Sequence, residues 1–233
     1  MSRGFKAGGF NAASPAGVEA YDQEHSWNYE GGVKTSTMGD RLTANVAVFS
    51  IDWSDLQVNV PNPQVPGQFF IANAAGARSS GAEFELHARP ERGLELFGGA
   101  GFTHARFASG SMSSGVDVGG KTLANAPSYT ADFGVQYSRP LRGELSVMAR
   151  AEAFCYGDYE YDDANTQGQS AYTLTNVRAG VHGKHAFAEV WVRNAFDTRY
   201  IPTAFPYPGL APSGFVGENG APRTFGFRAG VGF

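Results

Sequence analysis

Apolar and polar residues alternate one by one along most of this chain, which is the period of a β-strand and not of a helix. The segment 144–153 shows it most clearly, since its odd positions are apolar while Arg150 and Glu152 are charged. Segments 42–48, 82–88 and 129–137 alternate in the same way. Successive side chains of a strand point to opposite faces, so each of these segments should have one apolar and one polar face.

The pattern predicts ten strands, and the connections between them predict how the strands are arranged. We expect strands near 1–7, 26–37, 41–58, 76–89, 94–108, 127–139, 143–156, 171–182, 185–196 and 221–233. Tight turns (38–40, 90–93, 140–143, 183–184) alternate with long loops (8–25, 59–75, 109–126, 157–170, 197–220). In an up-and-down sheet, alternate connections lie at opposite ends, so the long loops should gather at one end. That asymmetry is typical of antiparallel transmembrane β-barrels.

Composition agrees with an all-β membrane protein. Charged residues make up 17 % of the chain, whereas soluble domains carry about 25 %. The net charge of −4 lacks the basic footprint of a nucleic-acid-binding protein, so we expect no nucleic-acid partner. The sequence has no run of about 18 apolar residues that could form a membrane-spanning helix, but a transmembrane strand needs only about 9–11 residues, with every second one apolar.

The sequence predicts no catalytic residue, no metal site and no cofactor. His182 and His185 have the spacing of a metal pair, but Gly183-Lys184 between two alternating segments indicates a hairpin turn, and zinc needs three or four ligands. Cys155 is the single cysteine, so no internal disulfide or thiolate cluster can form. No nucleophile can be placed beside a base.

Seven short segments resemble, in chain order, those of the TonB-dependent receptors. They are 4–11, 29–35, 49–57, Gly-x-Glu-x-Glu at 81–85, Asn-x-Pro-x-Tyr at 125–129, the segment 192–200 around Asn-Ala-Phe-Asp, and the segment 221–225, which begins with Ala-Pro-Arg. The family's fold is a barrel of about 22 strands filled by an N-terminal plug. The resemblance implies that residues 1–233 form the C-terminal part of such a barrel, about ten strands, without the plug and the earlier strands.

The resemblance also implies a function and a location. The complete protein would be a multi-pass β-barrel of the Gram-negative outer membrane, surrounded by its lipid. It would import iron-siderophore or similar nutrient complexes, and it would not be an enzyme. The inner-membrane TonB complex would act on the plug to release the ligand inward.

The barrel interpretation gives roles to particular side chains. Amphipathic rings in the long loops suit an aromatic or chelated ligand, although they would equally suit the aromatic belt at the membrane surface. These possible ligand contacts are Tyr21, Tyr159, Tyr161, Phe205 and Tyr207. We expect the charged residues of the polar faces to point into the wet lumen, namely Glu83, Glu85, Asp132, Arg150 and Glu152.

Aromatic residues at the strand ends should form two girdles at the membrane surfaces. At the long-loop end these are Tyr129, Tyr156, Tyr172 and Phe196; at the short-turn end they are Tyr137 and Phe233. The last strand also presents Phe225, Phe227, Val231 and the terminal Phe233 on one face. The resemblance implies that the barrel-assembly machinery reads this strand.

Two alternatives remain open at this point. The first is a passive porin-like barrel without TonB coupling. The second is a soluble secreted β-sandwich or adhesin, which would also be rich in short strands and turns.

Overall fold

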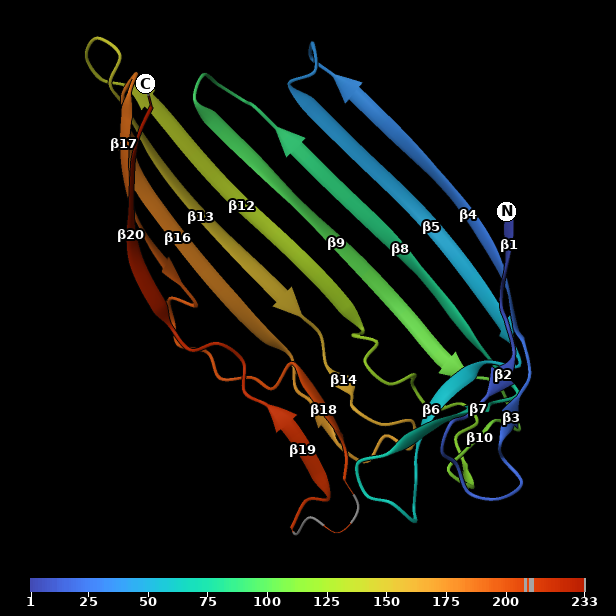
Figure 1. Cartoon of the computed structure of the whole chain (residues 1–233). Coiled ribbons are helices and arrows are strands. Elements are labelled where there is room, and N and C mark those ends of the chain that lie inside the picture. Colours follow the sequence, from blue (N-terminus) through green and yellow to red (C-terminus); the bar gives the residue numbers. More distant parts are fainter. Residues whose placement is uncertain (208, 210–211, 233) are drawn as a thin grey trace.

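The computed structural model describes residues 1–233 except 208, 210, 211 and 233. Its main feature is one antiparallel sheet in which strands adjacent along the chain lie side by side (Figure 1). In order, the strands are β1 (Ser2–Lys6), β4 (Glu24–Thr37), β5 (Leu42–Ser54), β8 (Gly76–Ala88), β9 (Leu94–Phe107), β12 (Tyr129–Pro140), β13 (Ser146–Tyr156), β16 (Tyr172–His182), β17 (Ala186–Arg193) and β20 (Thr224–Val231). No helix in the described part of the chain is long and apolar enough to cross a membrane.

All ten predicted strands are confirmed, with errors at some of their ends. The prediction of one strand over 41–58 is wrong beyond Ser54, because Asp55 has a φ of 55° and the chain there leaves the sheet. Similarly, β17 ends at Arg193 because Asn194 has a φ of 48°. Asn and Asp tolerate this left-handed conformation better than other non-glycine residues.

The predicted sorting of connections is confirmed as well. The four tight turns lie at one end of the sheet and the five long loops at the other (Figure 1). Glycine is required in one of these turns, since Gly93 has a φ of 83° and a Cβ there would collide with the carbonyl oxygen of Ser138.

Each long loop contains a two-stranded hairpin that the sequence did not predict. The hairpins are β2–β3 (Gly9–Phe10, Ala20–Tyr21), β6–β7 (Gln57–Pro61, Phe69–Asn73), β10–β11 (Met112–Ser113, Val116–Asp117), β14–β15 (Tyr159–Glu160, Gly168–Gln169) and β18–β19 (Thr203–Pro206, Phe215–Glu218). Since the described strands form one large sheet and these small hairpins, the β-sandwich alternative is wrong.

The strand register divides the large sheet into two faces. Phe84 pairs with Val46 and Ala100, and Phe133 pairs with Gly98 and Ala153, so these residues share what we call the apolar face. Among the described residues of the ten strands, every strongly exposed large apolar side chain lies on that face. A soluble monomer rarely exposes a continuous apolar surface of this extent.

The opposite, polar face is covered at its loop end by the loops themselves. Val58, Val60 and Phe70 of the β6–β7 hairpin form a buried cluster with Val118 and with Phe107 of β9. Phe107 pairs with Ala77, and both lie on the polar face. The loops therefore fold back over this face and hold a fixed structure beside the sheet.

Candidate functional site

The long loops line a half-open cavity of about 760 Å³. Its walls come from four of them, in segments within 58–69, 113–125, 161–164 and 203–206. Pockets for small molecules typically measure about 300–1,000 Å³ and combine apolar walls with a few polar groups. The cavity fits that description, and its walls come from segments far apart in the sequence.

Two aromatic rings form one edge of the cavity. Phe205 of β18 and Phe69 of β7 meet edge to face, with ring centroids 5.9 Å apart. The sequence pointed to Phe205 but not to Phe69, because the folding of two distant loops against each other decides their pairing. Tyr207 lies beside Gly67, so these loops also meet there. Tyr21 belongs to β3, outside the cavity lining.

Polar contacts fix the opposite edge. The Ser113 hydroxyl donates a hydrogen bond of 2.7 Å to Asp163 Oδ2. Asn165 joins the same two loops, because Oδ1 accepts from the Thr122 amide and Nδ2 donates to the Thr122 carbonyl, both at 2.9 Å. Burial raises the pKa of the Asp163 carboxyl, and the hydrogen bond from Ser113 opposes part of that rise. Sequence reasoning missed Asp163, whose burial depends on the loop packing.

Tyr159 and Tyr161 lie mainly inside the loop layer. Their exposed fractions are 7 % and 8 %, and they pack with Ala204 in a small buried cluster. The Tyr159 hydroxyl donates to the Pro202 carbonyl at 3.0 Å, and the Tyr161 hydroxyl donates to the Ile201 carbonyl at 2.8 Å. These contacts support a structural role, although Tyr161 also lines the cavity.

The structure corrects the aromatic girdle at the loop end. Tyr156 and Tyr172 pair with each other and stack with centroids 4.9 Å apart, and Tyr172 stacks on Tyr200 at 4.6 Å. The prediction that Tyr156 and Tyr172 belong to the girdle is wrong. Tyr156 is four residues from Glu152 on β13 and so shares its polar face, and Tyr172 is the register partner of Tyr156 on β16. Tyr129 does lie on the apolar face, beside Phe102.

The acidic residues predicted to face the lumen lie together on the polar face. Glu83, Glu85 and Asp132 contribute to one hollow, and Glu85 accepts a hydrogen bond of 2.8 Å from Asn45 Nδ2.

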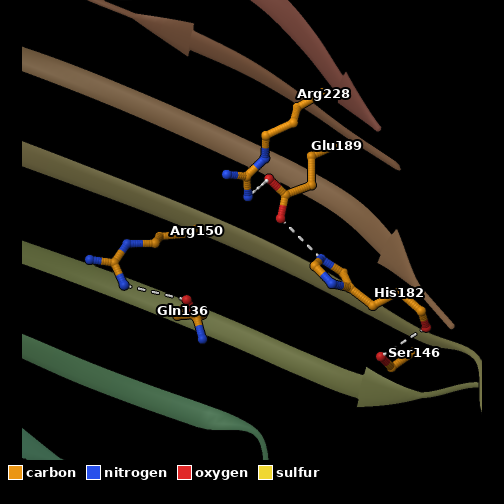
Figure 2. Close-up of polar contacts among 6 residues, drawn as sticks. All are labelled: Gln136, Ser146, Arg150, His182, Glu189 and Arg228. Atoms are coloured by element: carbon orange, nitrogen blue, oxygen red, sulfur yellow. Dashed lines mark hydrogen bonds and ion pairs between the residues drawn. The ribbon is translucent and has the colours of Figure 1, made fainter. Parts of the chain in front are cut away.

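Arg150 Nη2 lies 2.6 Å from Oε1 of Glu152 on the same strand. Arg150 also donates from Nη1 to Oε1 of Gln136 on the neighbouring strand β12, at 3.4 Å (Figure 2). Arg150 and Glu152 are on the same polar face. All five residues predicted to face the lumen therefore share one face.

Glu189 links the last three strands on this polar face. Its side chain is 3 % exposed and lies 2.6 Å from Arg228 of β20 and 3.1 Å from His182 of β16 (Figure 2). The turn predicted at Gly183-Lys184 is confirmed, since the Gly183 amide donates to the Ala186 carbonyl. Glu189 was not singled out in the sequence.

Asn194 closes the last long loop. Its Oδ1 accepts from the Thr198 amide at 2.9 Å, and its Nδ2 donates to the carbonyls of Thr198 and Ala221 at 2.9 and 3.0 Å. Asp197 Oδ1 accepts from the Arg223 amide at 2.8 Å. These bonds join the end of β17 to the start of β20, which gives the Asn-Ala-Phe-Asp segment a physical role.

Comparison with known proteins places the chain in a family. Residues 1–195 match the family model described as "TonB dependent receptor-like, beta-barrel". The metal-pseudopaline receptor CntO of Pseudomonas aeruginosa strain UCBPP-PA14 is 26 % identical over 215 residues, which cover 91 % of this chain and 28 % of that protein.

Solved structures show the same fold. The ferric yersiniabactin uptake receptor FyuA of Yersinia pestis has a TM-score of 0.83 and 24 % identity, with 100 % of this chain and 34 % of that chain covered. The ferripyoverdine receptor of the outer membrane of Pseudomonas aeruginosa, bound to ferripyoverdine, has a TM-score of 0.67 and 19 % identity, with 98 % and 30 % covered.

The chain spans about a third or less of the length of these relatives. The matched family model covers most of its residues, and the arrangement of strands, turns and loops agrees along its whole length. The chain therefore belongs to the TonB-dependent receptor β-barrel family.

Proposed function

We propose that these residues form the last ten strands of a larger barrel in a Gram-negative outer membrane. The apolar face would contact lipid, and the polar face would line the lumen around an N-terminal plug. The open edges of the sheet support this, because β1 and β20 each pair with one strand only among the described residues. An open sheet edge is not tolerated in hydrocarbon, so further strands would have to close the barrel.

We also propose that the barrel-assembly machinery reads β20. Phe225, Phe227 and Val231 support this, since all three lie on the apolar face and are 79 %, 68 % and 72 % exposed. Phe233 belongs to the same prediction but lies outside the described residues. An exposed aromatic strand is suited to recognition by edge pairing before the barrel closes.

For the loop layer we propose binding of an iron-siderophore or a similar metal chelate, which the TonB complex would release inward by acting on the plug. The observation that carries this proposal is the cavity built from four loops, with Phe69 and Phe205 at its aromatic edge. The names of the relatives, which are receptors for metal-pseudopaline and ferric yersiniabactin, point to the same class of ligand.

The test is ligand binding by the purified full-length protein that carries this chain. Ferric yersiniabactin, metal-pseudopaline and ferripyoverdine serve as probes, with tryptophan fluorescence as the readout. We expect one of them to bind, and Phe205→Ala to weaken that binding roughly tenfold, as expected for loss of a well-packed aromatic contact. Phe10→Ala is the matched control, because Phe10 is an exposed aromatic of another long loop that does not line the cavity.

Two results would contradict the proposal. Equal binding by Phe205→Ala, Phe10→Ala and the unchanged protein would show that the cavity is not the ligand site. Diffusion of small solutes through the purified protein in vesicles, without saturable binding of any probe, would favour the passive porin.

A further inference from the structure

An arginine pair occupies the apolar face near its loop end. Arg78 of β8 and Arg106 of β9 are direct register partners on this face, and both are exposed. Like charges placed directly opposite each other on neighbouring strands destabilise a sheet. Asp52 of β5 pairs with Arg78 on its other side and lies 2.5 Å from its Nε. One carboxylate beside two guanidinium groups still leaves a positive site.

The guanidinium groups are held in place but are not saturated. Arg106 donates from Nε to His104 and from Nη1 to the Gly120 carbonyl, at 3.0 and 2.7 Å. Arg78 donates from its Nε to Oδ1 of Asp52. Within the described residues, the terminal nitrogens of Arg78 therefore have no partner. Planar guanidinium groups with free N–H donors match the geometry of phosphate oxygens.

An apolar groove lies farther along the same face and the same strands. It measures about 780 Å³ and is lined by small residues, including Gly98, Ala100 and Ala131, between the larger Phe84 and Phe133. Phe84 follows Arg78 by six residues on β8, which is about 20 Å of extended strand. Ala82 and Phe102 are register partners between the two sites.

We propose that Arg78 and Arg106 bind the phosphate of a membrane lipid whose acyl chain lies in this groove. A cationic pair above an apolar groove on one face fits an amphiphile with an anionic head, and a free phosphate ion would leave the groove unfilled. The phosphate would offset the repulsion between the paired arginines. This inference rests on the proposed contact of the apolar face with lipid.

The experiment measures lipid retention by the full-length protein in detergent, using native mass spectrometry. The probes are bisphosphorylated lipid A, the same lipid with its phosphates removed, and inorganic phosphate as competitor. We expect the unchanged protein to prefer the phosphorylated lipid about tenfold, and Arg78→Gln/Arg106→Gln to lose that preference. Arg139→Gln is the matched control, because Arg139 lies on the same face at the tight-turn end of β12.

The comparison of the two lipids uses the unchanged protein, so it tests phosphate recognition even if the double variant fails to fold. Equal retention of both lipids would overturn the proposal, as would an unchanged preference in the double variant. If millimolar inorganic phosphate displaced the lipid, the proposal would also be overturned, because the arginine pair would then be a site for a soluble anion. Failure of the protein to insert into vesicles at all would instead contradict the membrane position itself.

Discussion

Asp163 is the loop residue whose charge depends most clearly on the fold. Burial raises the pKa of its carboxyl, so the folded loop binds the proton more tightly than the unfolded chain does. The loop should therefore gain stability as the pH falls through the raised pKa, and the gain should be complete below the ordinary value of about 3.9. At neutral pH the charged carboxylate destabilises the loop.

Asp163→Asn should remove this penalty while leaving an oxygen that can accept from Ser113. We expect residues 157–170 of the variant to exchange amide hydrogens more slowly than the unchanged protein at pH 7, after correction for intrinsic rates. The difference should shrink as the pH is lowered toward 4. Parallel pH profiles for the two proteins would show that Asp163 is not the responsible group.

Glu189 and Arg228 form an ion pair with unequal partners. Glu189 is 3 % exposed, whereas the Arg228 side chain is 56 % exposed. Arg228→Ala leaves a buried carboxylate and should cost about 3 kcal/mol of unfolding free energy. Glu189→Gln leaves an arginine that water can solvate and should cost about 1 kcal/mol. Urea unfolding of the full-length protein measures both, and an equal or reversed order would mean that Glu189 is not buried as described.

Asn194, directly after β17, connects the two ends of the loop between β17 and β20. Asn194→Ala removes three side-chain hydrogen bonds to Thr198 and Ala221. We expect faster proteolysis within 197–220 and little change in the stability of the large sheet, since the lost bonds lie outside it. Asn194→Gly is the control, because glycine accepts the positive φ without restoring the bonds. If the Gly variant resisted proteolysis within 197–220 as well as the unchanged protein does, the backbone conformation of residue 194, and not its side-chain hydrogen bonds, would hold the loop.

The strands could be predicted from the sequence, but the loop hairpins could not. In segments such as 144–153, apolar and polar residues alternate over ten residues. This alternation alone predicts a strand and shows which side chains lie on its apolar face and which on its polar face. The loop hairpins β10–β11 and β14–β15 have strands of two residues each, too short for any period to appear. Their positions depend on contacts such as Ser113 with Asp163, which join residues 50 positions apart.

The candidate site was predicted only in part for the same reason. Phe205 was predicted as a ligand contact because aromatic residues in long loops suit that role. Its partner Phe69 was not predicted, because the packing of two distant loops against each other brings the two rings together. Tyr156 and Tyr172 show the opposite case. Their residue type suggested a membrane girdle. However, Tyr156 is an even number of residues from Glu152, which can be read from the sequence and places Tyr156 on the polar face, together with its register partner Tyr172.

For the whole molecule, the central claim is that one face of the sheet contacts lipid and the other does not. Phe133 and Asp132 test it, because they are neighbours in the middle of β12 and lie on opposite faces. Phe133→Arg places a charge on the apolar face between Gly98 and Ala153. Asp132→Arg places the same charge near Glu83 and Glu85, which share its hollow.

The deciding measurement is the folding free energy of these two variants of the full-length protein in phospholipid vesicles, with heat-modifiable migration as the check for a closed barrel. Phe133→Arg should lose about 2–4 kcal/mol, the cost of an arginine facing the middle of a bilayer. Asp132→Arg should remain close to the unchanged protein. Equal losses in the two variants, or a larger loss for Asp132→Arg, would contradict the assignment of the apolar face to lipid.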